Sequence, residues 1–263
     1  MTKEVAMTTI VDELRLAGCV FAEDEAALLV EAAADQAELR LLVAERVAGR
    51  PIEYVLGWAE FAGIRVRVTD GVFVPRLRTV LLLQTALETV ASIAAPRILE
   101  LCCGSAALAT ALERARPDAI VLASDLDPRA VECARLNLGD PGRAFVGDLY
   151  DAVPPEHAGR FDVIVANAPY VPTGEIAFMP QEARLHEAAI ALDGGPDGTA
   201  LQARVAEGAT RWLAPGGTLV VETSVRQADA TCALFERAGL VPRILRDDSL
   251  DATAVAGVSI EEG

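Results

Sequence analysis

Residues 97–127 read RILELCCGSAALATALERARPDAIVLASDLD. The apolar run at the start is typical of a buried strand, and Gly104 allows the sharp turn that follows it. A helical pattern then ends at Pro117, and a second apolar run leads to Asp125. Because parallel neighbours need a crossover connection, this order predicts a strand–helix–strand unit with parallel strands.

The same alternation continues toward the C-terminus. We expect helices at 128–138, 200–213 and 227–240, and strands at 143–148, 161–167, 214–224, 242–248 and 253–260. Only a short link joins the last two strands, so they should form an antiparallel hairpin. The pattern predicts an α/β fold with a doubly wound, mainly parallel sheet.

The N-terminal part of the chain has a different pattern. Apolar side chains recur at helical spacing over residues 8–48, and Gly49 and Pro51 are expected to end this helical region. Residues 64–69 alternate between apolar and polar side chains, as in a half-exposed strand. We predict a helical N-terminal domain at 1–50, a β-hairpin linker at 51–74 and a main domain at 75–263.

Composition narrows the class of protein and its partners. The 263 residues include 23 lysines and arginines against 39 aspartates and glutamates, a formal net charge of −16, which disfavours direct binding to nucleic acid. Five cysteines without a C-x-x-C pair indicate reduced thiols and no metal site. The sequence shows neither an apolar leader nor an apolar run long enough for a membrane span, so we expect a cytoplasmic protein without membrane contact.

Three acids lie where successive predicted strands end. Glu100 precedes the first loop, Asp125 ends the second strand and Asp148 ends the third. Because the carboxyl ends of parallel strands meet at one edge, these carboxylates should share a crevice. Asp125 can accept both hydroxyls of a ribose, Asp148 can accept an adenine amino group, and Glu100 can hold an ammonium group indirectly.

The neighbours of these acids also suit a nucleoside. Leu126 and Leu149 can flank an adenine ring, and Gly104 lets a ligand approach the backbone closely. No basic residue lies in the first loop to meet a phosphate, so the crevice suits adenosine with a positive charge better than a pyrophosphate. The alternative is that the acids only cap the helices that follow them.

The fourth predicted strand ends in Asn167, Ala168, Pro169 and Tyr170. This NAPY sequence resembles the N-P-P-Y motif of methyltransferases that act on amino and amide nitrogens. With GRPIEYVLGWAEFAG, VFVPR, ILELCCGSAALA and EARLHEAAIALDGGPDG, it resembles the HemK/PrmC family of protein-glutamine N5-methyltransferases. The resemblance runs from about residue 49 almost to the C-terminus, and a helical N-terminal domain is also a feature of that family.

The resemblance implies a seven-stranded, Rossmann-like methyltransferase sheet that uses S-adenosyl-L-methionine (AdoMet) and releases S-adenosyl-L-homocysteine. It implies that the N-terminal domain recognises a protein substrate, in this family a peptide-chain release factor with a Gly-Gly-Gln loop. We expect the protein to be a monomer. The residues expected at the cofactor are Glu100, Cys102, Gly104, Asp125, Leu126, Asp148, Leu149 and Asn167.

The same motif implies how an amide nitrogen is methylated. Such a nitrogen is a poor nucleophile, because its lone pair is delocalised into the carbonyl group. The side-chain oxygen of Asn167 and the carbonyl oxygen of Ala168 can accept its two N–H bonds and aim the nitrogen at the methyl group. Pro169 restricts Ala168 to extended conformations, and Tyr170 can pack on the substrate amide. No strong base is needed.

Two segments depart from the pattern of the family. Residues 75–80 read PRLRTV where the family has P-R-P-E-T-E, so both acids are lost while Arg76 and Thr79 are kept. Cys102 and Ala106 replace glycines of the first loop. We expect the change at Ala106 to be mild, and we expect strain at Cys102 if its φ is positive. Ala168 replaces a proline and keeps the carbonyl acceptor.

Arg76, Thr79 and Glu187 are expected to contact the substrate. Glu187 follows His186, and the two could form a general acid–base pair, although we prefer a role for this segment in shaping the substrate mouth. His157 is expected in a surface loop. Glu222 could be a strand-end carboxylate near the site or a helix cap, and the sequence does not separate these roles.

Two other functions fit parts of the sequence. The Asn-x-Pro-Tyr logic also serves the exocyclic amine of adenine or guanine, with Tyr170 stacked on the base, as in nucleic-acid N-methyltransferases. The net charge and the lack of a basic stripe count against this alternative. An inactive binding module of the same fold is the second alternative, since a fold does not guarantee activity.

Overall fold

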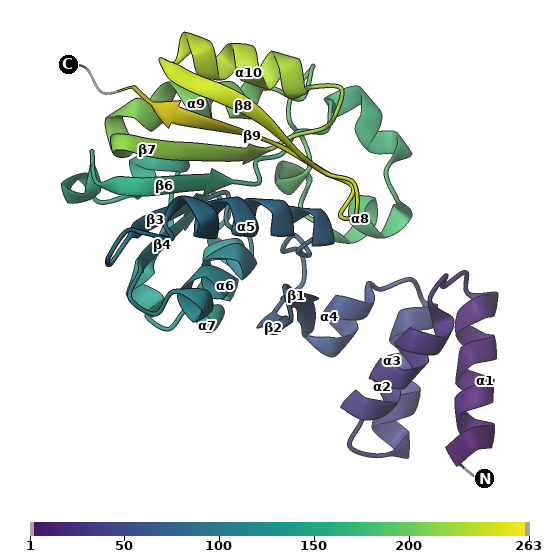
Figure 1. Ribbon diagram of the computed structural model, residues 1–263. Helices are drawn as coiled ribbons and strands as arrows, with labels where there is room; N and C mark the ends of the chain where they lie inside the picture. The colour runs from purple at the N-terminus through teal and green to yellow at the C-terminus, as the bar shows by residue number, and fades with distance from the viewer. Residues whose placement is uncertain (1–2, 261–263) are drawn as a thin grey trace.

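The computed structural model describes residues 3–260 and begins with a group of four helices (Figure 1). Their bounds are α1 (Lys3–Leu16), α2 (Ala22–Ala32), α3 (Gln36–Val47) and α4 (Ile52–Leu56). The first three pack around a small apolar cluster of their own that includes Leu14 and Leu29. The predicted end of the helical region is confirmed, because α3 stops at Val47, just before Gly49. The short helix α4, which has Pro51 as its N-cap, was not predicted.

A two-stranded hairpin of β1 (Trp58–Phe61) and β2 (Ile64–Arg67) follows α4. Gly63 has a φ of 77° and supplies the turn between the two strands. The alternation predicted for this segment is present, because Val66 is buried between the exposed Arg65 and Arg67. The hairpin packs against two helices that flank the main sheet, α6 (Ala107–Ala115) and α7 (Pro128–Asn137).

The main sheet has seven strands in the order β5-β4-β3-β6-β7-β9-β8, which confirms the predicted doubly wound sheet. Its strands are β3 (Arg97–Leu101), β4 (Ile120–Asp125), β5 (Ala144–Val146), β6 (Phe161–Ala166), β7 (Leu213–Glu222), β8 (Leu240–Asp247) and β9 (Ala252–Ser259). Pairing is parallel from β5 to β7, and β9 runs antiparallel to both β7 and β8, so the predicted terminal hairpin is also confirmed.

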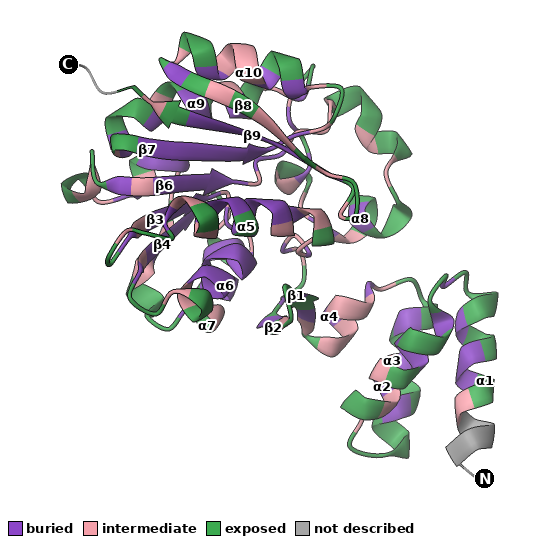
Figure 2. Cartoon of the chain, viewed as in Figure 1, coloured by how far each residue is buried: buried purple, intermediate pink, exposed green. Residues whose placement is uncertain are grey.

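Helices cover both faces of this sheet (Figure 1). One face carries α5 (Val80–Thr89), α6 (Ala107–Ala115) and α7 (Pro128–Asn137), and the other carries α9 (Ala200–Trp212) and α10 (Ala228–Arg237). A further short helix, α8 (Gln181–His186), lies between β6 and α9 in the chain. Successive strand residues such as Ile98 and Leu99 therefore enter opposite cores, and the central strands are buried almost throughout (Figure 2).

The register of the parallel strands aligns their carboxyl ends. Leu101 pairs with Ser124 and Ala166, and Ala166 pairs with Val221. The next residue of each strand therefore belongs to one row, which consists of Asp125, Cys102, Asn167 and Glu222. The chain switches direction between β3 and β6, because β4 and β5 lie to one side of β3 and β6 and β7 lie to the other. Ligands bind open α/β sheets outside such a switch point.

Candidate active site

A cavity of about 420 Å³ opens at this row of strand ends. Its wall brings together the loops after β3, β4, β5 and β6, and it also includes Thr79 from the 3-10 turn before α5 and Arg204 from α9. The predicted crevice is therefore present. The cavity is mostly apolar, with a few polar groups that converge on it, as in small-molecule sites.

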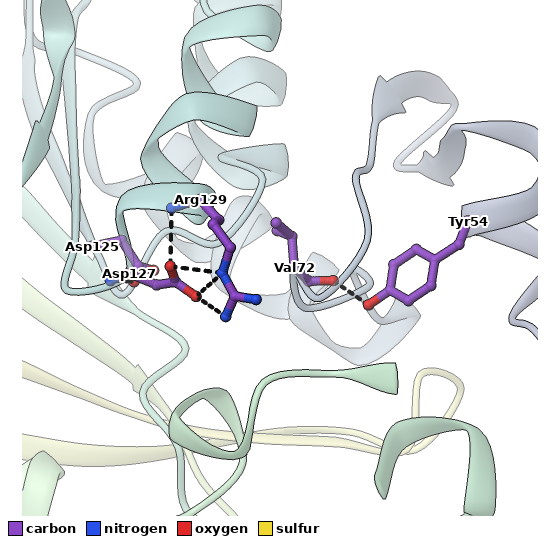
Figure 3. A network of polar contacts seen from close by, with 5 residues as sticks. All are labelled: Tyr54, Val72, Asp125, Asp127 and Arg129. Carbon is purple, nitrogen blue, oxygen red and sulfur yellow. Dashed lines mark hydrogen bonds and ion pairs between the residues drawn. The ribbon is translucent and has the colours of Figure 1, made fainter. Parts of the chain in front are cut away.

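Asp125, at the end of the neighbouring strand β4, fixes the first loop by hydrogen bonds. Its Oδ2 accepts a hydrogen bond of 2.9 Å from the backbone N–H of Gly104, and its Oδ1 accepts one of 2.9 Å from Asp127. Each oxygen keeps a lone pair, and the residue is on the cavity wall. Burial raises the pKa of this carboxyl group. The side chain that caps α7 is that of Asp127, which accepts from Arg129 (Figure 3).

Glu100 is fully buried behind the same loop and also serves the capping role that the sequence left open. Its Oε2 accepts a hydrogen bond of 2.8 Å from the backbone N–H of Ala109, in the first turn of α6. Burial raises the pKa of Glu100 to about 8, because the charged form is poorly solvated there. The folded chain therefore holds a proton on this residue at neutral pH.

Asp148 does not end β5, because that strand stops at Val146. The sequence predicted a free acceptor here, but the structure pairs Asp148 with Arg204 of α9 at 2.8 Å. The prediction missed Arg204, because a helical arginine 56 positions further along the chain has no local signal that places it in the crevice. Leu126 is half-exposed and Leu149 is buried, and both line the cavity as expected.

The first loop is strained at two positions. Cys102 has a φ of 54°, so the condition for strain at this residue is met. Ala106 has a φ of 55°, and the expectation that this substitution is mild is therefore wrong. A Cβ atom in this left-handed region costs roughly 1–2 kcal/mol relative to glycine. Gly104, at 53°, has no such cost.

The NAPY turn, residues 167–170, lies beside this loop at the end of β6. The Nδ2 of Asn167 donates a hydrogen bond of 3.1 Å to the hydroxyl oxygen of Thr79. Because the NH₂ group of Asn167 faces Thr79, its amide oxygen points away from Thr79. Asn167 itself lines the cavity. Neither that oxygen nor the carbonyl oxygen of Ala168 accepts a hydrogen bond from any residue that the structure describes. Two adjacent acceptors are thus available.

A glycine-rich loop, residues 193–198, holds the NAPY turn from behind. The side chain of Gln227 donates a hydrogen bond of 2.9 Å to the carbonyl oxygen of Tyr170. A Cβ atom at Gly194 would lie 2.7 Å from the Cα of Tyr170, and one at Gly198 would overlap the carbonyl oxygen of Tyr170. Only glycine allows this close approach. The preferred interpretation, in which this part of the chain shapes the site, agrees with these contacts.

Two contacts hold the segment that leads into α5. Tyr54 of α4 donates a hydrogen bond of 2.7 Å to the carbonyl oxygen of Val72 (Figure 3). Four residues later, the guanidinium group of Arg76 pairs with Glu187 at the end of α8. Glu187 is buried, and its second oxygen, Oε2, has no hydrogen-bond partner among residues 3–260. Burial raises the pKa of this carboxyl group.

The carboxylate of Glu187 is thus bonded to Arg76, and the structure gives no support to a pair with His186. His157 was predicted in a surface loop, and it ends the short 3-10 turn Pro155–His157 between β5 and β6. It is half-buried, its ring stacks on Phe161, and it contacts the guanidinium group of Arg97. Burial and the charge of Arg97 lower the pKa of His157. Both contacts lie at the opposite end of the strands from the cavity.

Glu222 ends β7 next to Asn167, and its carboxylate contacts side chains rather than a helix backbone. Thr79 Oγ1 donates to Oε2 at 2.7 Å, while Tyr170 Oη and Arg78 Nε donate to Oε1 at 3.1 Å each. The residue is 1% exposed. Burial raises its pKa, and the hydrogen bonds oppose that rise. The structure thus resolves the role of Glu222 as a strand-end carboxylate at the site.

Comparison with known proteins agrees with this arrangement. Residues 70–201 match the methyltransferase small domain family. A release factor glutamine methyltransferase of Bordetella pertussis is 41% identical over 210 residues, which cover 79% of this chain and 77% of the relative. One of Geobacter sulfurreducens is 34% identical over 84% of this chain and 77% of the relative.

This chain belongs to the release factor glutamine methyltransferase family. Its seven-stranded sheet is the Rossmann-like methyltransferase fold. Methyltransferases of this family and fold generally depend on AdoMet. No helix among residues 3–260 is long and apolar enough to cross a membrane.

The residues around the cavity fit AdoMet. The ligand carries positive charge on its sulfonium and ammonium groups, and the wall supplies the carboxyl groups of Asp125 and Asp148, the latter paired with Arg204. The buried carboxyl group of Glu100, which is protonated at neutral pH, lies on the same wall. Asp125 is held in place by two backbone N–H groups and keeps acceptor capacity for ribose hydroxyls. Gly104 lines the cavity and has no side chain, so a ligand can approach its backbone closely.

Proposed function

We propose that this chain transfers a methyl group from AdoMet to the side-chain amide nitrogen of a glutamine in a peptide-chain release factor. The observation that carries the proposal is the pair of acceptors at the NAPY turn. The amide oxygen of Asn167 and the carbonyl oxygen of Ala168 are adjacent, unpaired with described residues, and next to the cavity that fits AdoMet.

When bound, AdoMet supplies a methyl group that is already activated by its sulfonium. The chain then has to bind and orient. In the proposal, Asp125 holds the ribose, Leu126 and Leu149 flank the adenine, Asp148 accepts from its amino group, and the loop from Cys102 to Gly104 approaches the methionine part. For Asp148 this requires Arg204 to share the carboxylate with the ligand or to release it.

The substrate amide is proposed to lie between Tyr170 and the two acceptors. Each of its N–H bonds would donate to one acceptor, which holds the nitrogen lone pair in line with the methyl group. The ring of Tyr170 would cover the amide and exclude water. No described residue is required to remove a proton before methyl transfer, because the amide nitrogen can lose its proton to water afterward.

Arg76, Thr79 and Glu187 are proposed to line the path of the substrate polypeptide. Arg76 and Glu187 pair at the edge of a groove that runs from the NAPY turn toward α3 and α4. The N-terminal helices have their own apolar cluster, which supports a separate N-terminal domain. We propose substrate recognition by residues 1–50, a linker at 51–74, whose helix α4 also packs on that cluster, and a methyltransferase domain at 75–263.

Incubation of the purified chain with labelled AdoMet and a bacterial release factor tests this function. We expect label on the release factor, loss of label with Asn167→Ala, and unchanged protein folding in that variant. Calorimetry should show that AdoMet binds both the wild-type chain and the Asn167→Ala variant.

Three outcomes would contradict the proposal. Label on nucleic acid but not on protein would favour the alternative of a base N-methyltransferase. Tight AdoMet binding without methylation of any glutamine peptide would exclude the proposed acceptor. Failure of the wild-type chain to bind AdoMet at high micromolar concentration would favour an inactive module.

A further inference from the structure

We propose that Glu222 is a positioning residue that fixes which end of the Asn167 amide faces the substrate, through the hydroxyl group of Thr79. The inference rests on the proposed function, since it explains how the amide oxygen of Asn167 is kept available as an acceptor. Glu222 itself touches neither of the proposed ligands in this account.

The relay consists of three side chains from three segments. Glu222 ends β7, Thr79 precedes α5, and Asn167 follows β6. The hydrogen bonds are 2.7 Å from Thr79 to Glu222 and 3.1 Å from Asn167 to Thr79. Glu222 and Thr79 are buried, with 1% and 6% of their surfaces exposed, so water does not compete for these bonds.

The number of protons on each group determines which group donates in each hydrogen bond of the relay. A threonine hydroxyl has one proton to donate, and an ionised carboxylate can only accept. Thr79 therefore gives its proton to Glu222 and presents a lone pair to Asn167. Only the NH₂ end of the Asn167 amide can meet that lone pair. The oxygen end must then point to the side where the substrate amide would donate.

The second oxygen of Glu222 is held by two other donors. Tyr170 Oη and Arg78 Nε each donate to Oε1 at 3.1 Å, and the guanidinium carbon of Arg78 lies 5.9 Å from the centre of the Tyr170 ring. Arg78 therefore places a cation beside the buried carboxylate. One carboxylate thus positions both Asn167 and Tyr170.

Glu222→Gln should reverse the relay while keeping the shape of the side chain. The amide oxygen of the new Gln would face the two donors, Tyr170 and Arg78, and its NH₂ would face Thr79. Thr79 would then accept from the Gln and donate to Asn167. The Asn167 amide would rotate to present its oxygen to Thr79 and its NH₂ to the substrate. Two donors would then face each other where a hydrogen bond is needed.

The kinetic test compares Glu222→Gln with two variants of Thr79 on the release factor. We expect kcat to fall about 100-fold or more in Glu222→Gln and in Thr79→Val, as when one aligned hydrogen bond to the reacting group is lost. Thr79→Ser keeps the hydroxyl group and should restore most of the lost rate. The dissociation constant of AdoMet should change less than about threefold in all of them.

Thr85→Val is the matched control for removal of a buried threonine hydroxyl. Thr85 lies within α5 and donates only to the carbonyl oxygen of Leu81, away from the relay. We expect its kcat to stay near the wild-type value. The double variant Glu222→Gln, Thr79→Val should be no slower than the worse single variant, because both changes break one relay.

A second readout does not depend on the substrate. In the wild type, one side-chain amide proton of Asn167 is hydrogen-bonded, so its NMR signal should lie apart from those of exposed asparagines; Asn167→Asp identifies the pair of signals by deleting it. The displacement should vanish in Glu222→Gln and Thr79→Val and persist in Thr79→Ser. A wild-type chain that shows this pattern but does not methylate the release factor would refute the proposed function alone. Wild-type kcat in Glu222→Gln, or an unchanged Asn167 signal in it, would overturn the relay.

Discussion

Two turns at neighbouring strand ends meet their backbone requirements in opposite ways. In the loop after β3, Cys102 and Ala106 adopt positive φ angles in spite of their Cβ atoms. The NAPY turn after β6 is enclosed by Gly194, Gly198 and the side chain of Gln227. The first turn carries strain in its own backbone, whereas the second is held in place by contacts from other segments.

The difference indicates where each half of the site is vulnerable. Strain in the cofactor loop should lower stability without changing which groups face the ligand, because Asp125 still bonds to Gly104. The substrate turn, by contrast, depends on segments far away in sequence. A change in one of those segments should disturb the acceptors even when the NAPY residues themselves are intact.

The largest effect should come from a change at the wall of the NAPY turn. Gly198→Ala adds a Cβ atom against the carbonyl oxygen of Tyr170 at a φ of 76°. Overpacking and the left-handed backbone together should cost about 3 kcal/mol or more of unfolding free energy. Methyl transfer should fall with it. Denaturant unfolding and activity assays would measure both.

Gly216→Ala is the matched control for that variant. Gly216 has a φ of 74°, but nothing lies within 4 Å of an added Cβ atom. The loss of unfolding free energy should be limited to the backbone cost of about 1–2 kcal/mol, with activity retained. Equal losses in the two variants would show that the wall contact adds nothing.

The next effect concerns Glu100, behind the cofactor loop, and its dependence on pH. Its pKa is raised from 4.5 to about 8, so the folded chain binds a proton that the unfolded chain has already lost between these values. Its contribution to stability must therefore fall as pH rises through this window, by up to about 1.4 kcal/mol per pH unit.

Glu100→Gln tests this linkage without changing side-chain shape. We expect the variant to resemble the wild type near pH 5 and to be more stable by a few kcal/mol at pH 8, in the absence of AdoMet. Thermal or denaturant unfolding across pH would show it. Glu88→Gln, on the exposed side of α5, is the control and should follow the wild-type curve. Parallel curves for Glu100→Gln and wild type would refute the linkage.

A smaller gain should follow from relief of strain in the cofactor loop. Cys102→Gly and Ala106→Gly remove the Cβ atoms at φ angles of 54° and 55°. Each should raise the unfolding free energy by about 0.5–1 kcal/mol, because the lost strain exceeds the added freedom of the unfolded glycine. AdoMet affinity should stay the same or rise. A destabilised Ala106→Gly variant would mean that this loop is not strained.

The smallest effect should come from restoring the family's proline in the substrate turn. Ala168→Pro restricts the unfolded chain and should add about 0.4–1 kcal/mol where the native backbone accepts proline. Because the turn is already held by its surroundings, kcat should change less than about threefold. A large gain in kcat would show that the enclosure does not hold the turn as tightly as we infer.

Sequence patterns predicted the parts of this molecule that depend on local order. Apolar runs, Pro117 and Gly104 were enough for the sheet and for the row of strand ends, since parallel strands place those ends together. Side-chain contacts between segments far apart in the sequence could not be predicted from these patterns. The pair of Asp148 with Arg204 and the relay from Glu222 to Thr79 join residues 56 and 143 positions apart.

At some positions the backbone conformation was also not predicted from the sequence. The strain at Cys102 was predicted only on condition of a positive φ. The strain at Ala106 was missed, because its replacement of a loop glycine was interpreted as mild although it carried the same signal. The helix α4 was missed because Pro51 was interpreted as a stop, while proline is equally suited to the start of a helix.

Mapping the methylated atom tests the central claim most directly. The chain would be incubated with AdoMet and a release factor, and the product would be fragmented in a mass spectrometer. We expect one added methyl group on the side-chain amide nitrogen of a glutamine, absent with Asn167→Ala. A methyl group on any other residue type, or none although AdoMet is bound, would contradict it.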